Sequence, residues 1–174
     1  MQTIARGITY GDLMFLGKPR IIATAVLQSP AGVALVDPGP STCLDTLRGM
    51  LREQGIAIGD VRTVLLTHIH LDHAGATGTL VRDNPDIQVY VHERGAPHMV
   101  DPTKLLRSAS RLYGDDMDRL WGEFLPVPRD NVQILGGGER ISVADRDFEV
   151  AYTPGHASHH VSFFDRSSGG AFVG

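Results

Sequence analysis

The most informative stretch of this sequence is Thr67-His68-Ile69-His70-Leu71-Asp72-His73, which holds three histidines and an aspartate within six residues. In an extended segment, side chains at alternate positions share one side, so His68, His70 and Asp72 are predicted to face one cavity. His73 is expected to begin the next helix and to reach the same cavity from another direction. Imidazole nitrogens and carboxylate oxygens together suit zinc, and also iron or manganese. The stretch therefore predicts a metal site with four ligands from one loop.

The residues around this loop predict a buried strand, a helix and a second strand. Val61–Leu66 is short, apolar and rich in β-branched residues, which is typical of a strand covered on both faces. Ile69 and Leu71 alternate with the polar residues of the loop and are expected to point into the core. A helix is predicted over Ala74–Asp83, closed by a proline, and Ile87–His92 has the alternation of a further strand.

The residues before the loop predict two more strands and a helix. Ile21–Leu27 and Val33–Val36 are mostly apolar, and turn residues separate them. The helix is predicted from leucines at helical spacing: Leu44, Leu47 and Leu51. Ser41 or Thr42 is expected to cap this helix, and Gly55 is expected to end it.

The second half of the chain predicts two different regions. Gly95–Phe124 is helical in composition and is expected either to pack on the sheet or to form a substrate lid or a homodimer contact. After it, turns separate five short predicted strands: Val132–Leu135, Arg140–Val143, Phe148–Thr153, Val161–Phe164 and Ala171–Val173. An αβ first half and a hairpin-rich second half predict one α+β domain over residues 1–174, with two packed sheets flanked by helices.

A second histidine motif, Thr153-Pro154-Gly155-His156, stands where a predicted strand enters a tight turn. Such a turn can aim a side chain at the end of a neighbouring strand. His156 is therefore predicted to be a further metal ligand. For His159 and His160 we expect a structural role; the alternative is that one lines the pocket or hydrogen-bonds a ligand.

Composition excludes several classes of function. Of 174 residues, 42% are hydrophobic and 21% are charged, and the net charge is −4, so nothing favours nucleic acid or an anionic membrane surface as a partner. Cys43 is the only cysteine, which rules out an internal disulfide and a four-cysteine zinc site. The N-terminal residues lack the pattern of a signal peptide, and no apolar run has the length of a membrane helix. The chain is therefore expected to be cytoplasmic.

Three motifs together resemble those of the metallo-β-lactamase superfamily. Thr67–Gly75 is similar to its metal signature, Thr153–His156 to its next metal motif, and Val36–Pro40 to its early Asp-x-Gly turn, whose Asp supports the site. The match runs in order along nearly the whole chain. The resemblance implies an αββα sandwich of four layers, with the metals at one edge.

The resemblance also implies a ligand set for two ions, which are expected to be zinc. His68, His70 and His156 would hold the first metal, and Asp72 and His73 would hold the second. Asp72 would in addition act in catalysis, by orienting the nucleophile or accepting a proton. Two further family ligands, an Asp that bridges the metals and a final His, have no counterpart in this sequence, and Ala171–Val173 resembles the strand directly before that Asp. The chain is therefore expected to be part of a longer polypeptide, with the sandwich incomplete at its C-terminal end.

A two-metal site suits hydrolysis, because two metals activate a shared water and stabilise the charge that develops on the substrate. The resemblance therefore implies a hydrolase acting on a small ester, thioester or lactone. Ile69 stands where glyoxalase II-like thioesterases usually carry a further His, which counts modestly against that subgroup. Two alternatives remain: a mononuclear iron dioxygenase resembling the persulfide dioxygenases, and an inactive scaffold.

Overall fold

The computed structural model describes residues 1–174 and shows a seven-stranded sheet whose strands follow chain order. The first four strands pair antiparallel and the last four pair parallel, with β4 common to both parts. The strands are β1 (Gln2–Ala5), β2 (Ile8–Asp12), β3 (Ala23–Ser29), β4 (Gly32–Val36), β5 (Val61–Leu65), β6 (Gln88–His92) and β7 (Val132–Leu135).

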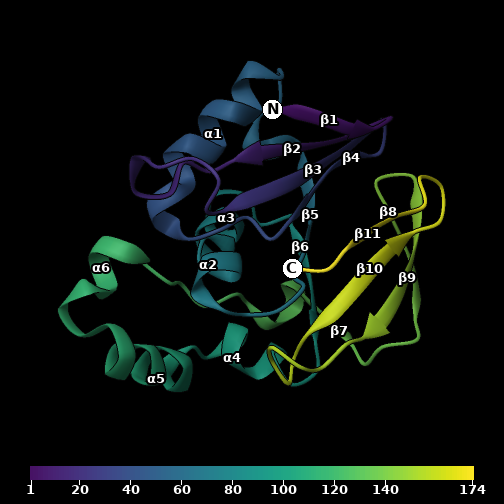
Figure 1. Ribbon diagram of the computed structural model, residues 1–174. Helices are drawn as coiled ribbons and strands as arrows, with labels where there is room; N and C mark the ends of the chain where they lie inside the picture. The colour runs from purple at the N-terminus through teal and green to yellow at the C-terminus, as the bar shows by residue number, and fades with distance from the viewer.

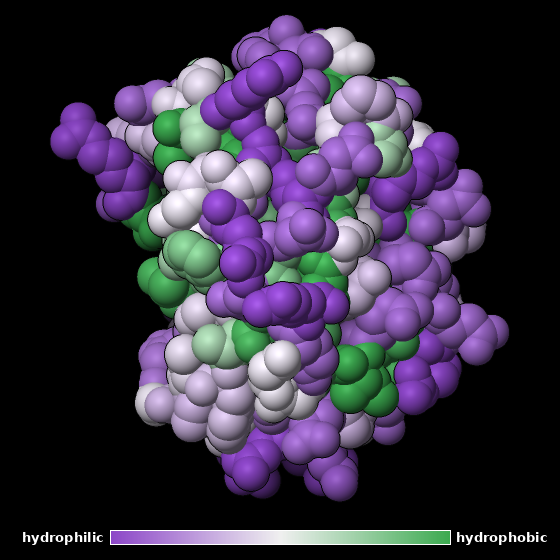
Figure 2. Space-filling view, turned by 90° about the vertical axis from the view of Figure 1, so that its right-hand side faces the viewer, coloured by the Kyte–Doolittle hydropathy of each residue, from purple (hydrophilic) through white to green (hydrophobic).

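A second sheet has four antiparallel strands in the order β11-β10-β9-β8. Its strands are β8 (Arg140–Val143), β9 (Arg146–Tyr152), β10 (Val161–Asp165) and β11 (Gly170–Phe172). The face of the molecule on this side is mostly hydrophilic, with apolar residues in separate patches (Figure 2).

Six α-helices and five short 3-10 helices connect the strands. The α-helices are α1 (Leu44–Glu53), α2 (Leu71–Ala74), α3 (Thr77–Asp83), α4 (Ala96–Val100), α5 (Thr103–Tyr113) and α6 (Met117–Leu120). The 3-10 helices are η1 (Phe15–Gly17), η2 (Ser41–Cys43), η3 (Ile58–Asp60), η4 (Gly114–Asp116) and η5 (Arg129–Asn131). None of these helices combines the length and the apolar character that crossing a membrane requires.

Helices α1, α2 and α3 lie on one face of the large sheet, and the small sheet lies on the other (Figure 1). Each face has its own core, because side chains alternate along the strands. On β3, Val26 belongs to the core under the helices, whereas Leu27 belongs to the core between the sheets, where Phe148 and Phe163 are fully buried. The chain thus shows three of the four layers of the predicted sandwich, in the order helices, sheet, sheet.

Most predicted strands occur within two residues of their expected bounds, but two features of the large sheet were not predicted. Strands β1 and β2 were missed because the side chains of β1 are largely exposed and lack an apolar alternation. The strand Val132–Leu135 occurs as predicted, but it pairs parallel with β6 and completes the large sheet. Sheet membership depends on this long-range pairing, which the local pattern does not contain.

The predicted caps of α1 were half right. Gly55 follows the helix with φ +72°, a left-handed conformation that suits glycine, and its N–H donates to the Arg52 carbonyl. The cap by Ser41 or Thr42 was wrong, because no side chain caps this helix. The hydroxyl of Thr42 instead donates to the carbonyl of Leu120, at 2.8 Å, and that of Ser41 donates to the carbonyl of Glu123.

The predicted helix Ala74–Asp83 is divided, because α2 begins at Leu71 and a break at residues 75 and 76 precedes α3. The start of α3 is packed so closely that Gly78 has no room for a side chain, because a Cβ there would lie 2.1 Å from the carbonyl oxygen of Leu125. Ile69 and Leu71 are buried in the core under the helices, as expected.

The segment Gly95–Phe124 is helical as far as Leu120 and packs partly on the main core. Leu105, Leu120 and Trp121 contact that core, whereas the side chain of Leu112 is 79% exposed. The ring of Trp121 stacks on Phe15, with centroids 5.5 Å apart. Together with the hydrogen bonds from Ser41 and Thr42, this stacking connects the segment to η1 and η2.

A buried ion pair links the second sheet to the N-terminal hairpin. The side chain of Asp165 is fully buried and accepts hydrogen bonds from Arg146 Nη1 at 2.7 Å, Ser168 Oγ at 2.6 Å and Ser167 Oγ at 2.7 Å. Arg146 also donates to the carbonyl of Arg6, in the turn between β1 and β2. Burial would raise the pKa of Asp165, but the hydrogen bonds from Ser168 and Ser167 and the charge of Arg146 hold it below its usual range.

This lowered pKa makes stability depend on pH. The carboxylate stabilises the fold fully above about pH 4, where an unfolded aspartate is ionised, and this contribution is lost as the pH falls through the lower folded-state pKa. We expect Asp165→Asn to lower the free energy of unfolding by about 1–3 kcal/mol at pH 7, because it leaves Arg146 without its charged partner. Urea unfolding at pH 7 and pH 3 measures this. A deficit that stayed constant between the two pH values would contradict the assignment.

Candidate metal centre

Three histidines from both sheets meet at one edge of the sandwich. The loop that follows β5 carries His68 and His70, and the loop between β9 and β10 carries His156. The ring centroids are 4.7 Å apart for His68 and His70, 4.8 Å for His70 and His156, and 5.0 Å for His68 and His156. The two predicted histidine motifs, 80 or more residues apart in sequence, are therefore adjacent in the structure.

The chemistry of these three rings fits a metal ion. One nitrogen of each lies within 4.8 Å of the others, and His70 Nδ1 lies 3.0 Å from His156 Nε2. His68 Nε2 is buried and has no hydrogen-bond partner. Burial, together with the neighbouring histidines, lowers the pKa of His68 to about 2, so this ring is neutral. A neutral ring with an unpaired, buried nitrogen is the form in which histidine binds a metal.

Asp72 and His73 lie beside this group, in α2. His73 Nε2 is 3.4 Å from Asp72 Oδ2, and the ring centroid of His73 is 4.0 Å from that of His68. The prediction that Asp72 shares an extended segment with His70 does not hold, because the helix begins at Leu71. Asp72 instead reaches the site from the first helical turn. His73 Nε2 and the Asp72 carboxylate lie side by side, but neither group of converging ligand atoms in the structure includes Asp72.

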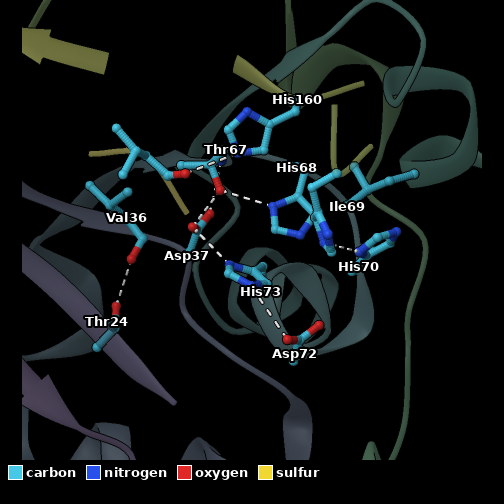
Figure 3. Close-up of polar contacts among 12 residues, drawn as sticks. Thr24, Val36, Asp37, Thr67, His68, Ile69, His70, Asp72, His73 and His160 are labelled. Carbon is cyan, nitrogen blue, oxygen red and sulfur yellow. Dashed lines mark hydrogen bonds and ion pairs between the residues drawn. The ribbon is translucent and has the colours of Figure 1, made fainter. Parts of the chain in front are cut away.

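Asp37 lies to the left of the histidines, beside Thr67 and His73 (Figure 3). This buried carboxylate accepts hydrogen bonds from the Thr67 backbone N–H at 2.9 Å, from Thr67 Oγ1 at 2.6 Å and from His73 Nδ1 at 2.9 Å. One of its oxygens also lies within 4.8 Å of nitrogens of His68 and His73. Because three donors already occupy the carboxylate, it is better suited to orienting ligands than to binding a metal itself.

The hydrogen bond from His73 Nδ1 to Asp37 leaves His73 Nε2 to face the site. Burial would lower the pKa of His73, but its hydrogen bonds with Asp37 and Asp72 raise it to about 10. A metal bound at Nε2 would therefore displace a proton. Burial would raise the pKa of Asp72, but the contact with His73 lowers it below its usual range, so Asp72 is ionised at neutral pH.

The two remaining histidines of this region differ in their surroundings. Both ring nitrogens of His160 are engaged, with Thr153 Oγ1 at 2.8 Å and with the Val173 carbonyl at 3.0 Å. These contacts fit the expected structural role. The ring of His159 lies 5.5 Å from that of His70, and its Nδ1 accepts a 3.4 Å hydrogen bond from the backbone N–H of Ile69.

Two residues of the site were not singled out from the sequence. The sequence motif assigns Thr67 no role, although a hydroxyl directly before the first histidine could indicate a hydrogen bond to the site. Gly174 passes the centre with φ +84°, and a Cβ there would lie 2.9 Å from His160 Nε2 and 3.1 Å from Thr67 Oγ1. The residues that follow β11 thus run directly against Thr67 and His160.

The chain is an α+β protein in which two sheets pack face to face and a histidine cluster lies at one edge. The model of one family, described as the metallo-beta-lactamase superfamily, matches residues 17–174. The chain therefore belongs to the metallo-beta-lactamase superfamily.

Curated relatives include a hydroxyacylglutathione hydrolase of Buchnera aphidicola, which is 26% identical over 141 residues, covering 81% of this chain and 41% of the relative. A probable metallo-hydrolase of Bacillus subtilis is 34% identical over 101 residues, covering 58% of this chain and 42% of the relative. The chain thus spans about two fifths of the length of these relatives.

Solved structures show the same fold. A metallo-beta-lactamase family protein of Thermus thermophilus superposes with a TM-score of 0.71 at 26% identity, covering 93% of this chain and 56% of that protein. A subclass B3 metallo-beta-lactamase from a soil metagenome superposes with a TM-score of 0.69 at 24% identity, covering 95% and 57%.

Proposed function

We propose that the whole protein, which would supply the two further family ligands, binds two zinc ions and hydrolyses a small ester, lactone or thioester, with a thioester favoured. The observation that carries the proposal is the triad His68, His70 and His156, in which His68 Nε2 is buried without a partner. These three would hold the first ion, and Asp72 and His73 would hold the second. Bound zinc lowers the pKa of a water ligand to about 7 and polarises the substrate carbonyl.

The residues around the centre have separate tasks in this proposal. The carboxylate of Asp72 is ionised and its side chain is 40% exposed, so an Asp72 oxygen can orient the attacking water and accept its proton. Asp37 holds His73 through Nδ1, which keeps Nε2 directed at the site. His68 has its lowered pKa from burial, so it stays neutral and available as a ligand across the physiological pH range.

The preference for a thioester rests on the relatives. Several are named hydroxyacylglutathione hydrolase, at 25–28% identity over 114–147 residues. Ile69, which distinguishes this chain from glyoxalase II-like enzymes, is buried in the core behind the loop. Its side chain is therefore placed to affect the packing of the loop rather than to contact a substrate.

The proposal is tested by elemental analysis of protein purified without added metal, followed by hydrolysis assays on the same sample. The assays use an acyl-glutathione thioester, an aryl ester and a lactone, and His156→Ala serves as the inactive comparison. For the whole protein, two zinc ions and turnover of the thioester are expected, whereas residues 1–174 alone are expected to bind fewer ions. One iron per chain would favour the dioxygenase alternative. Bound zinc without turnover of any substrate, or no metal at all, would overturn the proposal.

A further inference from the structure

Thr67 lies between the carboxylate of Asp37 and the ring of His68 and is completely buried. Its Oγ1 is 2.6 Å from Asp37 Oδ2 and 3.1 Å from His68 Nδ1. Its backbone is held as well, because its N–H donates to Asp37 Oδ1 and its carbonyl accepts from the Val161 N–H at 2.8 Å. The hydroxyl therefore has a fixed position between the two groups (Figure 3).

A count of protons decides what this hydroxyl does. A threonine hydroxyl has one hydrogen to donate, and an ionised carboxylate can only accept. The 2.6 Å contact with Asp37 therefore takes the hydrogen of Thr67, and only lone pairs of Oγ1 remain for His68. The 3.1 Å contact is then a hydrogen bond only if His68 Nδ1 carries the ring proton.

By the same count of protons, the other ring nitrogen of His68, Nε2, carries no proton. Neutral imidazole has a single N–H, so a proton on Nδ1 leaves Nε2 unprotonated, with its lone pair free. His68 Nε2 is the buried atom that has no hydrogen-bond partner in the structure. The contacts of Thr67 thus point to this tautomer, and no acceptor beside Nε2 favours a proton there instead.

We propose that Thr67 is a positioning residue whose hydroxyl relays the charge of Asp37 to His68 and selects the tautomer that turns Nε2 toward the metal. This inference rests on the proposed metal centre. Because Asp37 also accepts from His73 Nδ1, one carboxylate then orients a ligand of each ion: His73 directly and His68 through Thr67. A role limited to packing would need only the shape of the side chain.

The matched variants are Thr67→Val, which keeps the branched shape and removes the hydroxyl, and Thr67→Ser, which keeps the hydroxyl. Long-range ¹⁵N–¹H NMR correlations of the imidazole rings read the tautomer in metal-free protein. We expect His68 to be protonated on Nδ1 in the wild type and in Thr67→Ser, and to lose this preference in Thr67→Val. A wild-type His68 protonated on Nε2 would overturn the inference without any variant.

Zinc affinity, measured by competition with a chromophoric chelator, gives the second readout. We expect Thr67→Val to bind zinc about 10–100-fold more weakly than the wild type, as is typical when the support of a ligand is lost. Thr67→Ser should stay within about threefold, which is under 1 kcal/mol. Equal losses in both variants, or none in Thr67→Val, would overturn the inference and leave the proposed function standing. A wild-type chain that binds no zinc would overturn the function, while the NMR comparison still decides the tautomer.

Discussion

Replacing His70 with alanine is expected to weaken binding of the first zinc ion by about two to three orders of magnitude. An apparent binding free energy of about 10–16 kcal/mol, shared among about four ligands, gives about 3–4 kcal/mol for each. In this centre His70 Nδ1 and His156 Nε2 lie 3.0 Å apart, so both nitrogens converge on one position. Competition with a chelator of known affinity measures the loss.

The control for this experiment is His98→Ala. His98 is a half-buried histidine on α4 and belongs to neither group of converging ligand atoms. Like His70→Ala, this variant removes one histidine, but it should leave the zinc affinity unchanged. Comparable affinities for His70→Ala and the wild type would rule out the triad as the first metal site.

Replacing Asp37 with alanine is expected to have a large effect on stability and on metal content together. The variant loses three hydrogen bonds and leaves the buried N–H and hydroxyl of Thr67 and the Nδ1 of His73 without their acceptor. Each buried group without a partner costs about 1–3 kcal/mol, so the loss of all three should lower the free energy of unfolding by at least about 3 kcal/mol. Urea unfolding of the metal-free protein measures this fall, and elemental analysis measures the zinc content.

Asp86→Ala is the matched control for Asp37→Ala. The side chain of Asp86 is 76% exposed and pairs only with Arg62, so its removal should cost less than about 1 kcal/mol. The conservative variant Asp37→Asn should fall between the two, because its amide oxygen can still accept from some of these donors whereas its amide nitrogen cannot accept. If Asp37→Ala were as stable as Asp86→Ala, the proposed support of the two ligands by Asp37 would be wrong.

The sequence alone predicted the elements that carry a local pattern. Val61–Leu66 is strand-like by its β-branched residues. In the loop that follows it, the polar residues His68, His70 and Asp72 alternate with the core residues Ile69 and Leu71. His156 was predicted to approach this loop from the end of another strand, and the structure places it there. These predictions succeeded because the polar residues and the apolar core residues follow a pattern within a few neighbouring positions.

The features that were missed depend on partners far away in the chain. The hydroxyls of Ser41 and Thr42 suit a helix cap, but carbonyls 82 and 78 residues further on accept their hydrogen bonds instead. The contact of Thr67 with Asp37 spans 30 residues. Local propensity cannot distinguish such a distant acceptor from a nearby one, because the hydroxyl chemistry is the same in both cases.

The three histidines of the triad lie on loops that follow strands of two different sheets. His68 and His70 follow β5 of the large sheet, whereas His156 follows β9 of the small one, so an ion held by all three would act as a cross-link between the sheets. Such an ion stabilises only conformations in which both loops are docked, by an amount set by its concentration relative to its dissociation constant. Amide exchange and protease cleavage in the small sheet would then report metal loading, even though the large sheet holds most of the ligands.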